Sequence, residues 1–295
     1  MIDNTRGILA ISASVVVFIF NDALIKLAAQ TMPPLQAIGL RGLFATLWCG
    51  LALWASGDWR RIHHLTHRYV AMRGLLEALA AISYLIALAF IPFAIATAVG
   101  LSTPLFLAVL AVLMLNEKVG WRRWSAIMAG FAGVLMVIQP RPGDINGWTW
   151  LVVASSFCGA MRDVVARYVP PVVPTLVVSL GSAVAVGLVG CVWSTLEGWQ
   201  PIPARGLAFV VGSSLLLASG YQLLMIALRS GAEYSLMGSF RYASVLWALG
   251  IGYVLWGDVP NLLAVAGIAV VVAAGLYILH RERYRATDQR ATQRS

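Results

Sequence analysis

Charged residues are scarce in this chain: only 11% of its 295 residues are Asp, Glu, Lys or Arg, while 60% are hydrophobic. A soluble domain carries about 25% charged residues. With a mean hydropathy of +0.82, the chain has too few charges to cover a water-facing surface. The composition therefore excludes an ordinary soluble protein and indicates that the solvent is lipid.

Residues with catalytic or metal-binding chemistry are also few. The three cysteines lie inside apolar runs without a CxxC spacing, and no GxxxxGK[ST], HExxH or GxSxG pattern occurs. Three of the four histidines, His63, His64 and His67, share one basic loop, which we interpret as a solvated loop rather than a metal site. We predict no enzyme activity, no cofactor and no metal, and no ATP hydrolysis by a phosphate-binding loop.

Long apolar runs, by contrast, fill the chain. Since a helix needs about 20 mostly apolar residues to cross the hydrocarbon, division at Pro, Gly and charged residues gives ten spans, and no alternation typical of a β-barrel is present. The predicted fold class is an all-α polytopic membrane protein with ten transmembrane helices. The spans are 7–28, 35–56, 70–90, 93–115, 122–139, 147–168, 174–196, 205–228, 232–256 and 260–280.

The net charge of +9 comes from basic residues in short gaps between spans and in the last fifteen residues. With the N-terminus placed in the cytoplasm, 14 Lys and Arg residues lie on that side and two, Arg141 and Arg205, on the other. This asymmetry is the positive-inside pattern of membrane proteins. It predicts that both termini are cytoplasmic, and it argues against nucleic-acid binding.

The two halves of the chain match weakly at a shift of 141 residues. Asp22 falls on Asp163, Lys26 on Arg167 and Pro33 on Pro174. Five spans in each half would place the second half the other way up, which is the inverted repeat of many secondary transporters. We expect one five-helix repeat over residues 1–142, a second over 143–280, and a basic cytoplasmic tail over 281–295.

Polar side chains inside the spans are the candidates for a substrate pathway, because a charge at a helix centre costs about 2.5–3.5 kcal/mol and needs a partner or a function. Asp22 with Lys26, and Asp163 with Arg167, are four residues apart and could form ion pairs that only hold helices together. Arg73 and Glu77 are better explained as an interfacial anchoring pair. The pathway candidates are Asn21, Asp22, Lys26, Tyr84, Arg162, Asp163, Tyr221, Gln222, Arg241, Tyr242 and Trp247, and Pro104 is the expected kink of the fourth span.

The stretch AIATAVGLSTPLFLAVLAVLMLNEKVGWRRWSAIMAGFAGVLMVIQP, residues 94–140, resembles the signature region of EamA-type members of the drug/metabolite transporter (DMT) superfamily. A central proline, Pro104, and a terminal acid, Glu117, carry the resemblance, and the small residues Ala126, Gly130 and Gly133 follow. The resemblance implies a ten-helix transporter in the bacterial cytoplasmic membrane, most similar to the YddG-like exporters of aromatic and neutral amino acids. One departure is Val245, which stands where the second half would repeat Pro104.

The sequence and the resemblance together favour a secondary transporter that exports a neutral or aromatic amino acid by alternating access. The alternative cargo is S-adenosylmethionine, riboflavin or a similar metabolite, taken up rather than exported. A channel or a membrane-embedded enzyme is a more distant alternative. The expected partners are the small-molecule substrate, the lipid bilayer and protons as a coupling ion, in a monomer or weak homo-oligomer.

Overall fold

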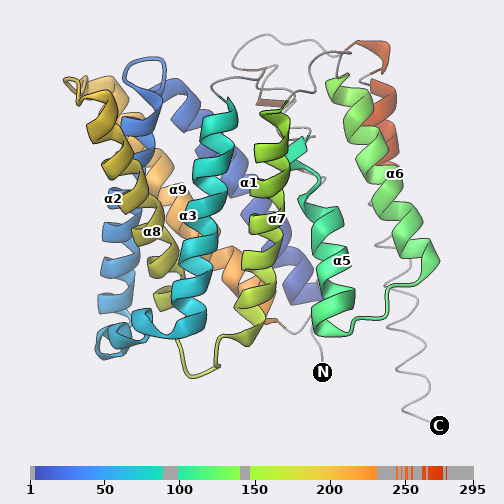
Figure 1. Ribbon diagram of the computed structural model, residues 1–295, viewed down its shortest axis with the longest axis horizontal. Coiled ribbons are helices and arrows are strands. Elements are labelled where there is room, and N and C mark those ends of the chain that lie inside the picture. The colour runs from blue at the N-terminus through green and yellow to red at the C-terminus, as the bar shows by residue number, and fades with distance from the viewer. Residues whose placement is uncertain are drawn as a thin grey trace.

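The structure is a computed structural model of residues 1–295, and it describes residues 4–88, 99–139 and 147–230, followed by isolated residues and the short stretches 261–263 and 265–274 up to residue 277. Every regular element in this part of the chain is helical. The helices stand side by side in one layered bundle, with their ends at two opposite faces (Figure 1).

The bounds of the helices follow the apolar runs of the sequence. The α-helices are α1 (Asn4–Ala28), α2 (Pro34–Ala55), α3 (Arg68–Leu88), α5 (Thr103–Leu115), α6 (Trp121–Ile138), α7 (Thr149–Val165), α8 (Thr175–Glu197) and α9 (Ala204–Arg229). Two short 3₁₀ helices, η1 (Asp58–Thr66) and η2 (Ala166–Tyr168), lie at helix ends. Prolines open α2, α8 and α9 from the N-cap position, where a missing N–H breaks no bond.

Membrane crossing is supported by length and composition. Within the described residues, five helical stretches are long and apolar enough to span a bilayer: Arg6–Ala28, Pro34–Ala55, Thr149–Tyr168, Thr175–Thr195 and Ala204–Arg229. The all-α polytopic class predicted from the sequence is confirmed. The predicted ninth span lies almost wholly outside the described residues, and the tenth is described mainly over Val265–Ala274.

The packing of the helices is symmetric under exchange of the two halves. At the shift of 141 residues, α1, α2 and α3 correspond to α7, α8 and α9. α1 packs on α9 as α7 packs on α3, α2 packs on α9 as α8 packs on α3, and α2 and α8 pack on each other. In Figure 1, α2 and α8 lie together at the left of the bundle, with α3 and α9 next to them.

Glycines set the distance between α2 and α8. A Cβ added to Gly42 would meet the backbone of Gly187 at 2.5 Å from its nitrogen, and one added to Gly39 would meet Gly190 and Cys191 at 2.9 Å. Only residues without a side chain permit such an approach of two helix backbones. The two halves are therefore joined at their centre by direct backbone packing.

Pro104 is the expected kink of the fourth span, but in the structure it does not kink a continuous helix. It lies in the first turn of α5, after a turn at Leu101 and Ser102 that separates α5 from the helical residues 99 and 100. Ser156 of α7 donates to the carbonyls of Val99 and Gly100 at 3.3 Å. The fourth span is thus interrupted, and the proline occupies a position where its missing N–H costs nothing.

Candidate functional site

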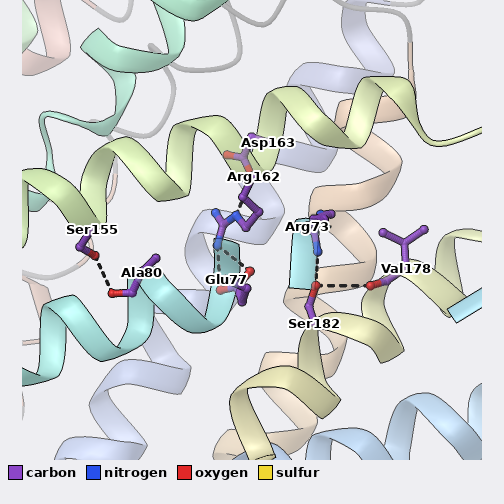
Figure 2. Close-up of polar contacts among 8 residues, drawn as sticks. All are labelled: Arg73, Glu77, Ala80, Ser155, Arg162, Asp163, Val178 and Ser182. Atoms are coloured by element: carbon purple, nitrogen blue, oxygen red, sulfur yellow. Dashed lines mark hydrogen bonds and ion pairs between the residues drawn. The ribbon is translucent and has the colours of Figure 1, made fainter. Parts of the chain in front are cut away.

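Four charged side chains meet between α3 and α7, on the side of the bundle where α1 begins. Arg162 of α7 holds both carboxylate oxygens of Glu77 of α3, at 2.8 and 2.7 Å, and its Nε lies 3.0 Å from Asp163 Oδ1. The side chains of Arg162 and Glu77 are 14% and 11% exposed and that of Asp163 is 0% exposed. Figure 2 shows the Arg162 guanidinium pointing from α7 onto Glu77.

Arg73 completes this group, which we call the N-side cluster (Arg73, Glu77, Arg162, Asp163 and Ser182). Its Nη1 donates to Ser182 of α8, whose hydroxyl in turn donates to the Val178 carbonyl (Figure 2). Arg73 is 0% exposed, and its Nε and Nη2 have no hydrogen-bond partner. Buried guanidinium nitrogens without partners are costly, and the bond to Ser182 is the described hydrogen bond of this side chain.

A second polar group lies toward the opposite face, where α1 ends and α2 begins. Asn21 is 1% exposed, donates to Asp22 Oδ1 at 2.8 Å and accepts from Arg41 Nη1 at 3.4 Å. Asp22 itself is exposed and Arg41 is half-buried, with a buried Nε that has no partner. We call these three residues the acid–base trio (Asn21, Asp22 and Arg41).

The N-side cluster and the trio occupy equivalent positions in the two halves. The shift that places Asn21 and Asp22 on Arg162 and Asp163 also places Arg41 on Ser182. Ser182 lies seven residues into α8 and Arg41 seven residues into α2, so each is about 10 Å along the axis from the start of its helix. The two groups therefore lie at similar depths from opposite faces of the bundle.

Aromatic residues lie between the two groups. Tyr221 of α9 is 4% exposed and lies within electrostatic range of Arg41, Glu77 and Arg162. Its ring meets Phe18 of α1 edge-on, with centroids 5.9 Å apart. The hydroxyl of Tyr221 donates no hydrogen bond within the described residues, so it is available at the centre of the bundle.

The remaining pathway candidates separate by their surroundings. Tyr84 packs against Ala87 and Val152. Gln222 bonds Thr175 at 2.7 Å and Ser179 at 3.3 Å, which ties α9 to α8. Trp247 is 46% exposed and Lys26 is also exposed, while Arg241 and Tyr242 lie outside the described residues. Their role in transport stays a prediction.

Two residue pairs at four-residue spacing make their described contacts with other partners. Among the described contacts Asp22 is held by Asn21 rather than by Lys26. Glu77 pairs with Arg162 on another helix, and Arg73 is fully buried instead of anchoring the interface. The spacing shows which side chains on one helix could meet, but packing between helices supplied better partners.

The histidine loop lies at the surface where α1 begins. Within η1, the rings of His63 and His64 stack 4.1 Å apart, and no group of three metal-ligating side chains occurs among the described residues. Local desolvation and the charges of His63, His67 and Arg61 hold the pKa of His64 below its ordinary value. A lowered pKa leaves His64 uncharged near neutral pH.

Comparison with known proteins shows what the first half of the chain and its fold are similar to. Residues 5–139 match the EamA-like transporter family. A solved crystal structure with 18% sequence identity superposes with a TM-score of 0.81 and covers 96% of this chain and 99% of its own. At that identity the superposition establishes the fold alone.

Curated relatives have transport functions. The S-adenosylmethionine uptake transporter of Rickettsia felis is 26% identical over 72% of this chain and 71% of its own. The pseudopaline exporter of Pseudomonas aeruginosa is 26% identical over 90% and 93%, and the riboflavin transporter of Rhizobium johnstonii is 25% identical over 77% and 72%. The chain is a multi-pass metabolite transporter whose first half is similar to the EamA-like family, and the prediction that it is not an enzyme is confirmed.

Proposed function

We propose that this EamA-like transporter takes up S-adenosylmethionine, or a metabolite with the same amino-acid group and positive charge, across a bacterial cytoplasmic membrane by alternating access. The observation that supports this cargo is the pairing of acid and base at membrane depth in the acid–base trio. An ammonium and a carboxylate on one carbon need such a pair. Riboflavin has neither group, so the trio favours an amino-acid derivative over a flavin.

The amino acid exporter expected from the sequence is the second candidate, and the same observation supports it. A free amino acid presents the same ammonium and carboxylate to an Asp and an Arg. The relatives favour S-adenosylmethionine, because they include uptake transporters for it and do not indicate an amino acid cargo. The two candidate cargos differ in the substituent on the α-carbon. Competition between S-adenosylmethionine and amino acids for transport therefore distinguishes them.

Alternating access requires contacts between the halves that close one face while the other is open. On the side where α1 begins, the closing contacts are charged: Arg162 of α7 binds Glu77 of α3, and Arg73 of α3 binds Ser182 of α8. On the opposite side, Gln36 of α2 exchanges two hydrogen bonds with the backbone of Gln200, at 2.8 and 3.0 Å. Both sets join residues before position 142 to residues after it, as a pair of gates would.

Proteoliposomes containing the purified full-length chain test the cargo. Vesicles preloaded with unlabelled S-adenosylmethionine should accumulate the labelled compound by counterflow, and excess external S-adenosylmethionine should block this accumulation. A panel of neutral and aromatic amino acids and riboflavin is assayed in parallel, with and without a pH gradient to detect proton coupling. Counterflow of an amino acid or of riboflavin, with none of S-adenosylmethionine, would refute the proposed cargo.

A further inference from the structure

The acid–base trio has unused hydrogen-bonding capacity on both its acid and its base. A guanidinium carries five N–H donors, but Arg41 uses Nη1 only in a long 3.4 Å bond to Asn21, and its Nε has no partner. Asp22 accepts one bond from Asn21 through Oδ1, and within the described residues its other oxygen accepts none. A ligand with one anionic and one cationic group could satisfy both.

Accessibility distinguishes the trio from its counterpart in the other half. At the equivalent positions, Asp163 is 0% exposed and Arg162 is occupied by Glu77. Asp22, in contrast, is exposed. α9 contains no Asp or Glu, so no carboxylate from α9 can neutralise Arg41. The polar groups of the N-side cluster are occupied by one another, whereas those of the trio keep unused hydrogen-bonding capacity.

An aromatic pair lies beside the trio. Phe18 and Asp22 are four residues apart on α1 and share a face of that helix, and the Phe18 ring lies against Gly220, where an added Cβ would meet it at 2.6 Å. Tyr221 follows Gly220 and meets the same ring. Aromatic rings attract cationic ligands through their faces and supply apolar surface. A positive sulfonium attached to the amino-acid group would therefore have suitable neighbours.

We infer that the acid–base trio is the binding site for the amino-acid group of the cargo. Arg41 binds the carboxylate, Asp22 binds the ammonium, Asn21 holds the two side chains apart, and Phe18 and Tyr221 lie beside the sulfonium. This inference rests on the proposed function, because it concerns the same transported molecule. It assigns one chemical group of the cargo to Arg41 and another to Asp22. It therefore predicts which group of the cargo each variant would no longer recognise.

Binding to the purified full-length chain in nanodiscs tests the inference with two ligands, S-adenosylmethionine and its decarboxylated form. The wild-type chain should bind the intact compound about 10- to 100-fold more tightly, the range expected for a hydrogen-bonded charge pair. Arg41→Gln should weaken binding of the intact compound by a similar factor and leave the decarboxylated form almost unchanged. Arg41→Lys should recover part of the preference, since it keeps the charge but loses the planar fork.

Asp22→Asn provides the complementary measurement, with a deaminated analogue as the second ligand. Arg205→Gln, at the first turn of α9, and Asp58→Asn, in η1, are charge-matched controls outside the trio and should bind like the wild type. A melting curve in the same nanodiscs identifies variants that fail to fold. If Arg41→Gln fails to fold, the milder Arg41→Lys tests the inference instead. The measured quantity is then its preference for S-adenosylmethionine over the decarboxylated form.

The outcomes separate the inference from the function. Suppose that the wild type binds S-adenosylmethionine, and that Arg41→Gln loses affinity for both ligands equally or for neither. Arg41 then does not bind the carboxylate, so the inference is wrong, while the proposed function stands. If the wild type binds neither S-adenosylmethionine nor any amino acid of the panel, both are overturned. A loss confined to the carboxylate-bearing ligand supports the site.

Discussion

The contact between α2 and α8 gives a sharp prediction about stability. A Cβ at Gly42 would lie 2.5 Å from the backbone nitrogen of Gly187, whereas relaxed contacts between heavy atoms need about 3.5–4.0 Å. Gly42→Ala therefore requires the two helices to separate by about 1 Å. Backbone atoms cannot rotate out of the way as a side chain can, so the helices themselves must move.

The separation cannot be confined to one residue. Gly39, one turn earlier, already places its own missing Cβ 2.9 Å from Gly190 and Cys191, so both turns lose contact when the helices part. Inserting a methyl group into such packing costs about 1–3 kcal/mol. At about 2–4 °C per kcal/mol for a chain of more than 150 residues, the Tm should fall by roughly 2–12 °C.

Gly50→Ala is the matched control, because Gly50 lies on the same helix and an added Cβ there meets nothing within 4 Å. Replacing a helical glycine by alanine stabilises a helix by about 1 kcal/mol when no contact opposes it, so this variant should melt at or slightly above the wild-type temperature. Both are followed by tryptophan fluorescence during heating in detergent. Equal melting temperatures for the two variants would show that α2 and α8 do not pack through Gly42.

Other contacts give further expectations. Glu77→Gln leaves Arg162 with a buried charge and one fewer partner. This variant should lower stability by about 3 kcal/mol and abolish counterflow. The charge-swapped Glu77→Arg/Arg162→Glu variant should recover part of the lost stability. Gln36→Ala removes both bonds to Gln200, so proteolysis in the loop 198–203 should speed up in proteoliposomes while the melting temperature falls by only a few degrees. Pro104→Ala should change stability by less than about 1 kcal/mol, because the proline lies in the first turn of α5; a large stabilisation would instead indicate a strained mid-helix kink.

The extents of the spans could be predicted from the sequence because one strong physical constraint governs them. Lipid requires about 20 apolar residues and internally satisfied backbone groups, and the eight described α-helices follow the first eight predicted spans. The interruption before Pro104 was not predicted. Residues 93–115 are mostly apolar, so their hydropathy predicts one uninterrupted helix. Hydropathy cannot show that the carbonyls of Val99 and Gly100 accept hydrogen bonds from Ser156.

Side-chain partners were predicted less well. Pairing by four-residue spacing considers one helix at a time, and both Asp22 and Glu77 found partners that this rule does not reach. Not every glycine in the spans faces another helix: an added Cβ at Gly159 would meet only Thr103 at 3.9 Å, and one at Gly250 would meet nothing within 4 Å. Small residues are common in membrane helices, so their spacing alone does not identify the glycines that face another backbone.

The shift of 141 residues also relates the arginine–serine contacts of the two halves. Applied to the contact between Arg73 and Ser182, it gives Ser214 and Arg41, with arginine and serine exchanged between the halves. The structure makes the first contact, but Ser214 accepts from Trp48 at 2.9 Å and Arg41 turns to Asn21. The two sides of the bundle are therefore in different states although their residues correspond. Under the proposed alternating access the two sides would exchange these contacts, and Arg41 would then leave the trio. Release of the cargo's carboxylate and closure of that side would then be the same movement.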